Sequence, residues 1–279
     1  MTASRPRDLW TVAEPIHAVT YFAPESHAAW ADAGLRGFWR GYFATRTAPL
    51  GPVPASTATA VLYNFAPGMV ARALPALWDV VTPAAAWDAR LAGVDAALRR
   101  AWGDGGVAAP EVAEAAARAR DAVAGCTPEG RALFAAHLAV PWPDAPHLVL
   151  WQAVTRLREF RGDGHVAALV LEGLDPCEAL VTHGAAGDVP LAVLRSTRAW
   201  SDDDWEAARA RLTERGWLDG DQLTAAGTEV RDRVEARTDE RALAPWQHLG
   251  EEDADRLRAT VRPWSRAIVD TGLLTRPPR

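Results

Sequence analysis

The stretch that decides the fold is SDDDWEAARARLTERGWLDGDQLTAAG, residues 201–227. Ser201 followed by three acids is typical of a helix start, because a serine N-cap bonds the first free amides and acids there complement the helix dipole. Gly216 ends that helix, and residues 217–224 predict two short strands around an Asp-Gly turn. Thr224 caps the next helix. The stretch therefore predicts helix, small β-hairpin, helix.

Outward from this stretch the chain is expected to be helical. Of its 279 residues, 49% are hydrophobic and 24% charged, and alanine, the best helix former, is abundant. Runs of β-branched residues are scarce, which argues against a β-sandwich or barrel. Helices are predicted at 8–18, 24–35, 37–51, 56–65, 67–80, 83–102, 108–124, 127–138, 147–160, 165–173, 176–183, 201–216, 225–238 and 251–271, with 190–198 a helix or a strand.

A proline cluster divides the chain. Pro141, Pro143 and Pro146 bar a helix from running through, so the cluster is the best candidate for a domain boundary. We expect an all-α fold with a small β-wing, built as two helical halves of which the C-terminal one is winged-helix-like. The predicted units are an N-terminal helical domain (1–105), a helical connector (106–146), a winged-helix-like domain (147–240) and a C-terminal helix and tail (241–279).

The order helix, RGWL, acidic-glycine turn, LTAAG, helix resembles the winged helix of MarR-type regulators over about fifty residues. The whole chain resembles actinobacterial proteins described as helix-turn-helix proteins, for which we know no established activity. The segments that carry this second resemblance are EPIHAVTYFAPE (14–25), GLRGFWRGYFATRTAPLG (34–51), LREFRGDGHVAALVLEGL (157–174) and RLTERGWLDGDQLTAAG (211–227). The resemblance implies a fold and supplies no mechanism.

The charge pattern disfavours nucleic acid as a partner. A recognition helix places its first residues against base edges, and here 201–206 carry four carboxylates. The turn that corresponds to a wing adds Asp219 and Asp221, and the formal net charge is −6. DNA affinity rests mainly on cations that neutralise phosphates, so these acids oppose it.

The first candidate binding wall is the aromatic and arginine-rich helix at 37–51. Phe38, Tyr42 and Arg46 are spaced i, i+4, i+8 and share one face, and Arg40 is expected near the rim of the same cavity. Arginine offers a planar fork for carboxylates, and aromatic rings beside it offer an apolar bed. The alternative is an ordinary core helix whose arginines reach the surface.

The second candidate is the segment 158–165, which contains Arg158, Asp163 and His165. Gly162 and Gly164 are expected to break the helix and to set His165 on the first turn of a new one. A helix N-terminus disfavours imidazolium, so His165 would be neutral and could act as a base that Asp163 orients. The alternative is that Asp163 is an N-cap and His165 packs in the core.

We interpret the chain as a small-molecule-binding protein with its site in a cleft between the two halves. A more specific hypothesis is a metal-free enzyme of specialised metabolism that catalyses a proton-transfer or elimination-type reaction in this cleft. The alternatives are a ligand-responsive winged-helix transcription regulator and a protein-interaction module, which could be a homodimer. Zinc, nucleotide and Rossmann motifs are lacking, no metal site is predicted and the cofactor stays unknown. Without an apolar run of membrane-spanning length, we expect a cytoplasmic protein.

Overall fold

A computed structural model describes residues 5–187 and 189–274, so most of the predicted C-terminal tail lies outside the described residues. Within these ranges the chain is helical apart from one two-stranded antiparallel sheet, which confirms the all-α fold with a small β-wing. The first elements are α1 (Arg5–Phe22), α2 (Pro24–Asp32), α3 (Phe38–Thr47), α4 (Ala55–Val61), α5 (Pro67–Ala71) and α6 (Pro83–Val107).

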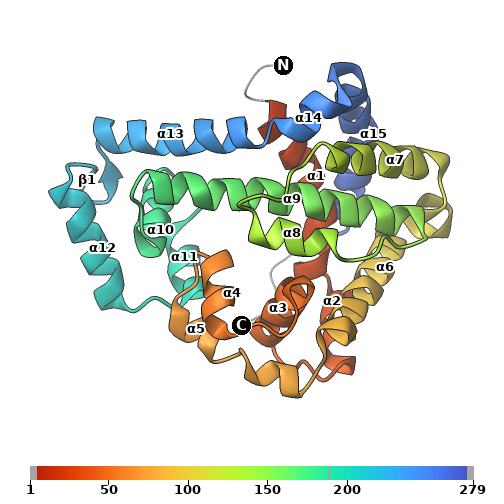
Figure 1. The fold of residues 1–279 in the computed structure, drawn as a ribbon, viewed down its shortest axis with the longest axis horizontal. Coiled ribbons are helices and arrows are strands. Elements are labelled where there is room, and N and C mark those ends of the chain that lie inside the picture. Colours follow the sequence, from red (N-terminus) through yellow and green to blue (C-terminus); the bar gives the residue numbers. More distant parts are fainter. Residues whose placement is uncertain (1–4, 188, 275–279) are drawn as a thin grey trace.

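The remaining elements follow in chain order (Figure 1). They are α7 (Pro110–Ala124), α8 (Ala132–Leu138), α9 (Pro146–Leu171), α10 (Pro176–Ala185), α11 (Leu191–Arg198), α12 (Asp202–Glu214), β1 (Leu218–Asp219), β2 (Gln222–Leu223), α13 (Ala225–Arg241), α14 (Ala244–Leu249) and α15 (Glu251–Asp270). Leu218 pairs with Leu223 and Asp219 with Gln222 in the hairpin.

The caps read from the sequence are present in the structure. The Ser201 side chain accepts from the Asp204 amide and the Asp204 carboxylate accepts from the Ser201 amide, which is a complete capping box for α12. Thr224 caps α13 by accepting from the Gly227 amide. These local bonds fix where the two helices that flank the hairpin begin.

The predicted break at Gly162 is wrong. The helix α9 runs unbroken for 26 residues through Gly162 and Gly164 and ends at Leu171. The two helices predicted at 147–160 and 165–173 are therefore one helix, and Asp163 is not an N-cap. Neighbouring helices support α9 along its length, since α7, α8 and α13 all pack on it, and residues of α8 and α13 bond to it next to the two glycines. Packing of this kind outweighs the weak helix preference of glycine.

Other differences concern element ends. The single helix predicted at 67–80 is the short α5 followed by a 3-10 turn, Ala76–Asp79, since Pro75 cannot continue a helix. The helix predicted at 127–138 starts only at Ala132, after Gly130 with a φ of 72°. By contrast, α6 is longer than predicted, since it continues past Trp102 across a kink at Gly103.

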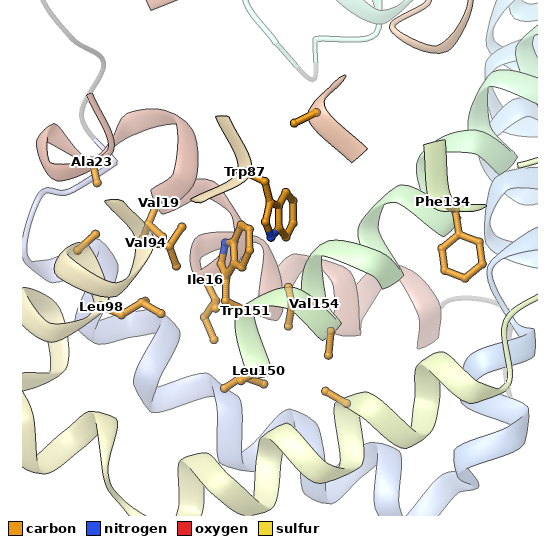
Figure 2. Packing of buried hydrophobic residues seen from close by; sticks show 14 of the residues in the cluster. Ile16, Val19, Ala23, Trp87, Val94, Leu98, Phe134, Leu150, Trp151 and Val154 are labelled. Carbon is orange, nitrogen blue, oxygen red and sulfur yellow. The ribbon is translucent and has the colours of Figure 1, made fainter. Parts of the chain in front are cut away.

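Helix α9 crosses the middle of the molecule, with α13 alongside it at one end and α7 at the other (Figure 1). Its N-terminal part belongs to the larger hydrophobic core, where Trp87 and Trp151 lie 5.8 Å apart between ring centroids, near Ile16 and Val19 (Figure 2). Its C-terminal part contributes Ala168 and other residues to a second core shared with α10, α12 and α13. The one helix thus carries both cores, and the division into four domains stays a prediction.

Candidate functional site

A cavity of about 230 Å³ lies where α9 faces α3 and the segment 61–65. Helix α3 contributes Tyr42 and Arg46, α9 contributes side chains between Arg158 and Val166, and Arg198 comes from the end of α11. The cavity is therefore lined by elements from both parts of the chain that the proline cluster separates.

The cavity contains a charge cluster of two arginines around one carboxylate, Arg46, Arg158 and Glu159, hereafter the cavity cluster. An Arg46 Nη2 to Glu159 Oε2 distance of 3.4 Å joins α3 to α9, and Arg158 Nη1 lies 3.1 and 3.2 Å from the two carboxylate oxygens. The Glu159 side chain is only 1% exposed. A carboxylate this deeply buried can stay ionised only because cations lie beside it.

The protonation states follow from these contacts. Burial by itself raises the pKa of Glu159, but the guanidinium groups of Arg46 and then Arg158 hold it well below its usual range. Burial lowers the pKa of Arg46, and the neighbouring Tyr42 and Glu159 outweigh this effect, so its pKa lies well above the ordinary value. The cavity cluster therefore carries two positive charges and one negative charge at neutral pH.

Tyr42 extends the cluster along α3. Arg46 Nη1 donates to the Tyr42 hydroxyl oxygen at 2.6 Å, and the guanidinium carbon lies 5.7 Å from the centre of the tyrosine ring. The bond uses a lone pair of that oxygen, so the hydroxyl proton can still be donated. Donors from both residues can thus reach one acceptor in the cavity.

His165 also lines the cavity, seven positions after Arg158 on α9. Thr238 donates its hydroxyl proton to the Val234 carbonyl, so His165 Nδ1 must donate to Thr238 Oγ1, at 2.9 Å. Burial and the charges of Arg231 and Arg161 lower the pKa of His165 to about 3. The ring is therefore neutral, with its proton on Nδ1 and a lone pair on Nε2.

Asp163 has a different neighbour from the one the sequence suggested. Its Oδ2 accepts from the Phe134 amide at 2.9 Å, in the first turn of α8. Two residues that are two positions apart on one helix are rotated by about 200°, so Asp163 does not orient His165 on the continuous α9, although both line the cavity. Burial raises the pKa of Asp163 to about 6.

Phe38 and Arg40 are not brought to this cavity. Phe38 stacks on Tyr42 with ring centroids 6.0 Å apart, as the i, i+4 spacing requires, and packs against Trp30 and Trp39 instead. Arg40 is exposed. The structure thus gathers Tyr42, Arg46, Arg158, Asp163 and His165 around one cavity and leaves the first turn of α3 outside it.

Glu159 and Asn64 also line the cavity, although they are not among the predicted site residues. Glu159 lies in the segment 158–165, but nothing in the sequence signals its contact with Arg46, 113 positions away. Asn64 sits in a stretch predicted as helix, whereas it follows the end of α4 and its buried Oδ1 has no hydrogen-bond partner among the described atoms. An asparagine between Tyr63 and Phe65 in an otherwise apolar stretch is the signal that could have marked it.

Other chemistry-bearing groups do not gather into a site. Among the described residues, no group of three or more His, Cys, Asp or Glu side chains is arranged to hold a metal ion. Cys177 is buried, and burial raises the pKa of its thiol to about 12, so it is not a reactive thiolate. None of the helices in the described ranges is long and apolar enough to cross a membrane.

The order α10, α11, α12, hairpin, α13 is that of a winged helix-turn-helix unit, in which α12 takes the place of the recognition helix. Residues 6–275 match the sequence pattern of a family described as the Helix-turn-helix family. The chain belongs to this family. No curated protein and no solved structure matches it. The match includes α3 and α9, so the cavity lies within the region shared with this helix-turn-helix family.

The recognition-helix face of this helix-turn-helix protein is acidic in three dimensions as well. Asp202, Asp203 and Glu206 are exposed on α12. Arg195 pairs with Asp202 at 2.7 Å, and Arg209 pairs with Asp221 of the hairpin at 2.6 Å. The cations nearest to this face are thus already paired with carboxylates.

Proposed function

We propose that this helix-turn-helix protein binds a small organic anion, with a carboxylate as the charged group, in the cavity between α3 and α9. The observation that carries the proposal is the cavity cluster, where Arg46 and Arg158 both pair with the one carboxylate of Glu159. Glu14 is a further carboxylate near these arginines, but burial raises its pKa, which weakens it as a counter-charge. A buried guanidinium without a full counter-charge is costly, and a bound anion removes that cost.

A third cation strengthens this argument. Arg90 is fully buried beside the cluster, and its hydrogen bonds go to neutral oxygens, the Thr20 hydroxyl at 3.0 Å, the Thr45 carbonyl at 3.2 Å and the Tyr21 hydroxyl at 3.3 Å. Its positive charge adds to the potential that an anion would meet in the cavity. Arg46 Nε, buried with no partner among the described atoms, supplies a further donor.

The test is isothermal titration of the full-length protein with cinnamate as the probe. Arg46→Gln and Arg158→Gln are each expected to weaken binding by about 10- to 100-fold, because each removes a charge-assisted hydrogen bond. Arg40→Gln is the matched control, since Arg40 lies on α3 with Arg46 but is exposed and outside the cavity.

Two outcomes contradict the proposal. One is cinnamate binding that Arg46→Gln and Arg40→Gln weaken equally, which would indicate attraction by overall charge. The other is the absence of binding for cinnamate, for other monocarboxylates and for inorganic phosphate at millimolar concentration.

A second candidate, a ligand-responsive transcription regulator, is favoured by the family description and by the likeness of 201–227 to MarR-type winged helices. The exposed acids of α12 count against it, because they would face phosphates. Fluorescence anisotropy with random and upstream-promoter duplexes, with and without cinnamate, decides between the two. We expect no binding at physiological salt, whereas a steeply salt-dependent affinity better than micromolar would establish the regulator.

A further inference from the structure

Gly162 lies in the interior of α9, where glycine is one of the least favourable residues, and it lines the cavity. A Cβ at this position would lie 3.6 Å from its nearest neighbour, Glu159 Oε2, which is an ordinary van der Waals contact. Its φ is that of a helix. Neither packing nor backbone geometry therefore requires glycine here.

Gly164, two positions on, shows the opposite situation. A Cβ there would lie 2.8 Å from Arg131 Nη1 and 3.3 Å from Arg241 Cβ, so the close approach of neighbouring elements accounts for this glycine. Packing therefore explains the glycine at 164 but not the glycine at 162. Its missing side chain leaves the α9 side of the cavity open.

Arg158, Gly162 and His165 lie on one face of α9, since they are spaced i, i+4, i+7. Seven residues of helix span about 10 Å along the axis. On this face of α9, Arg158 lies at one end, the bare helix at Gly162 lies in the middle and the uncharged imidazole of His165 lies at the other end. Arg161, which pairs with Asp239, and Arg198 also line the cavity.

The end of the cavity at His165 offers an acceptor. His165 donates through Nδ1 to Thr238, which leaves Nε2 as a lone pair. Asn64, on the cavity wall, adds the unpartnered Oδ1, and the Trp200 indole donates at 3.0 Å to the Asn64 main-chain carbonyl, which fixes the position of this residue. A ligand group that reaches this end must donate a hydrogen bond to be recognised.

Part of the cavity wall is aromatic. Trp10, Tyr42, Tyr63 and Phe65 line the cavity together with the glycine. Aromatic side walls and a floor without a side chain favour a flat, thin, unsaturated group over a branched aliphatic one.

We infer that the ligand is an aryl carboxylic acid with a hydrogen-bond donor at the far end of its ring, and that it lies along α9 over Gly162. The carboxylate meets Arg46 and Arg158, the ring lies over Gly162, and a hydroxyl or amino group donates to His165 Nε2. This inference rests on the proposed function and adds to it the class of ligand, the direction in which the ligand lies and the residue that leaves space for it.

Calorimetry with two probes tests the inference on the full-length protein. Wild type is expected to bind 4-hydroxycinnamate about tenfold or more tightly than cinnamate, since the two differ only in the donor. In His165→Phe, which cannot accept a hydrogen bond, this preference should fall to near unity.

The glycine is tested by filling the space above it. Gly162→Leu should weaken both probes by at least tenfold, and Gly162→Ala should weaken them less, while the melting temperature of the alanine variant stays the same or rises. Gly164→Ala is the matched control and should lower the melting temperature, because a Cβ there displaces the Arg131 guanidinium, which donates to the Phe160 and Arg241 carbonyls.

The inference is overturned if Gly162→Leu folds and binds both probes as wild type does. It is also overturned if wild type does not distinguish the two probes, or if His165→Phe keeps the preference. In each of these cases a loss of binding in Arg46→Gln would still support the anion site, so the two proposals fail separately. Should Gly162→Leu not fold, the alanine variant and the His165→Phe comparison decide.

Discussion

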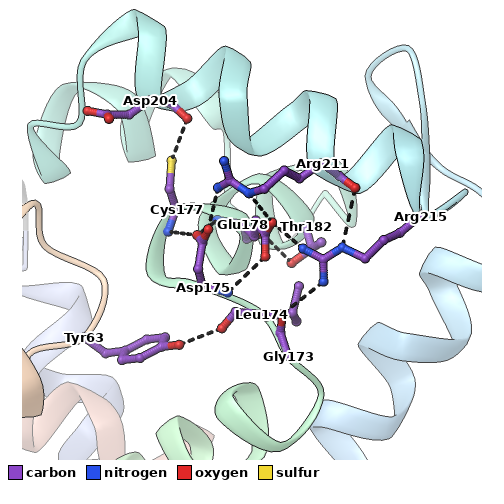
Figure 3. A network of polar contacts seen from close by, with 10 residues as sticks. All are labelled: Tyr63, Gly173, Leu174, Asp175, Cys177, Glu178, Thr182, Asp204, Arg211 and Arg215. Carbon is purple, nitrogen blue, oxygen red and sulfur yellow. Dashed lines mark hydrogen bonds and ion pairs between the residues drawn. The ribbon is translucent and has the colours of Figure 1, made fainter.

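The molecule contains two clusters of arginine around a glutamate that is 1% exposed, and they differ in charge balance. In the cavity cluster, Glu159 forms ion pairs with both Arg46 and Arg158. In the second, hereafter the cap cluster, Glu178 of α10 and its N-cap residue Asp175 pair with Arg211 of α12 and with Arg215, which follows the end of α12 (Figure 3). The cap cluster has as many carboxylates as guanidinium groups, whereas the cavity cluster has one carboxylate fewer.

The carboxylates of the cap cluster also cap the N-terminus of α10. Asp175 Oδ1 accepts from the Cys177 and Glu178 amides at 2.8 Å, and Glu178 Oε2 accepts from the Asp175 amide at 3.0 Å (Figure 3). This capping box explains Glu178 without any ligand. A buried arginine–glutamate cluster is therefore a sign of a binding site only when its charges do not balance and a cavity adjoins it.

The largest effect is expected for Glu159→Gln. Loss of the carboxylate between two partly buried guanidinium groups should lower the free energy of unfolding by about 3 kcal/mol or more, because both cations lose their paired counter-charge. Denaturant unfolding at pH 7 measures this. Millimolar 4-hydroxycinnamate should raise the stability of the variant by more than it raises that of wild type. If the variant is as stable as wild type without the ligand, the cluster is not as buried as described.

A smaller loss, about 1–3 kcal/mol, is expected for Glu178→Gln in the cap cluster. Arg211 and Arg215 have side chains 45% and 31% exposed, so water can replace much of the lost interaction, and Asp175 still pairs with Arg211. The same denaturant series measures it, with no added recovery from an anion. If this variant loses more stability than Glu159→Gln, the contrast between the clusters is wrong.

Asp163→Asn addresses the pH dependence at the edge of the cavity. Burial raises the pKa of Asp163 to about 6 in the folded state, above its value of about 4 in an unfolded chain. The folded state then holds the extra proton, so the stability from this group is present below pH 4 and is lost as pH rises through 6. The asparagine variant should lack this pH dependence, and its free energy of unfolding at pH 7 should lie within about 1 kcal/mol of that of wild type. Thermal unfolding between pH 4 and 7 measures both. A slope between pH 4 and 6 equal to that of wild type would assign it to other groups.

The sequence predicts the winged unit far better than the cavity, for a physical reason. Ser201 and Thr224 specify helix starts through bonds to residues three positions away, so their effect can be read locally. The contacts of the cavity join Arg46 to Glu159 and set Asn64 beside α9, and such long-range contacts leave no local pattern.

Gly162 and Gly164 misled the prediction for the same reason. Both weaken a helix locally, yet the elements packed on α9 keep it continuous. Tyr42 and Arg46 could be placed on one face from spacing alone, but the side of α3 that meets the cavity, and the exclusion of Phe38 and Arg40 from it, depend on how α3 docks.

The smallest effect on stability at pH 7 is expected for His165→Gln. This variant is informative because it tests the sign of the pH dependence. Burial lowers the pKa of His165 to about 3, so the folded state stays neutral while an unfolded chain takes up a proton below about pH 6.5. The stability from this group is therefore present above pH 6.5 and is lost as pH falls toward 3, opposite to the trend from Asp163. Glutamine can still donate to Thr238 but does not titrate, so the variant should lie within about 1 kcal/mol of wild type at pH 7 and lose less stability on acidification. Urea unfolding at pH 7, 6, 5 and 4 measures both quantities. Should wild type and variant lose stability in parallel, His165 would be protonated in the folded protein, and a charged imidazole could not accept the hydrogen bond that the far end of the cavity offers to a ligand.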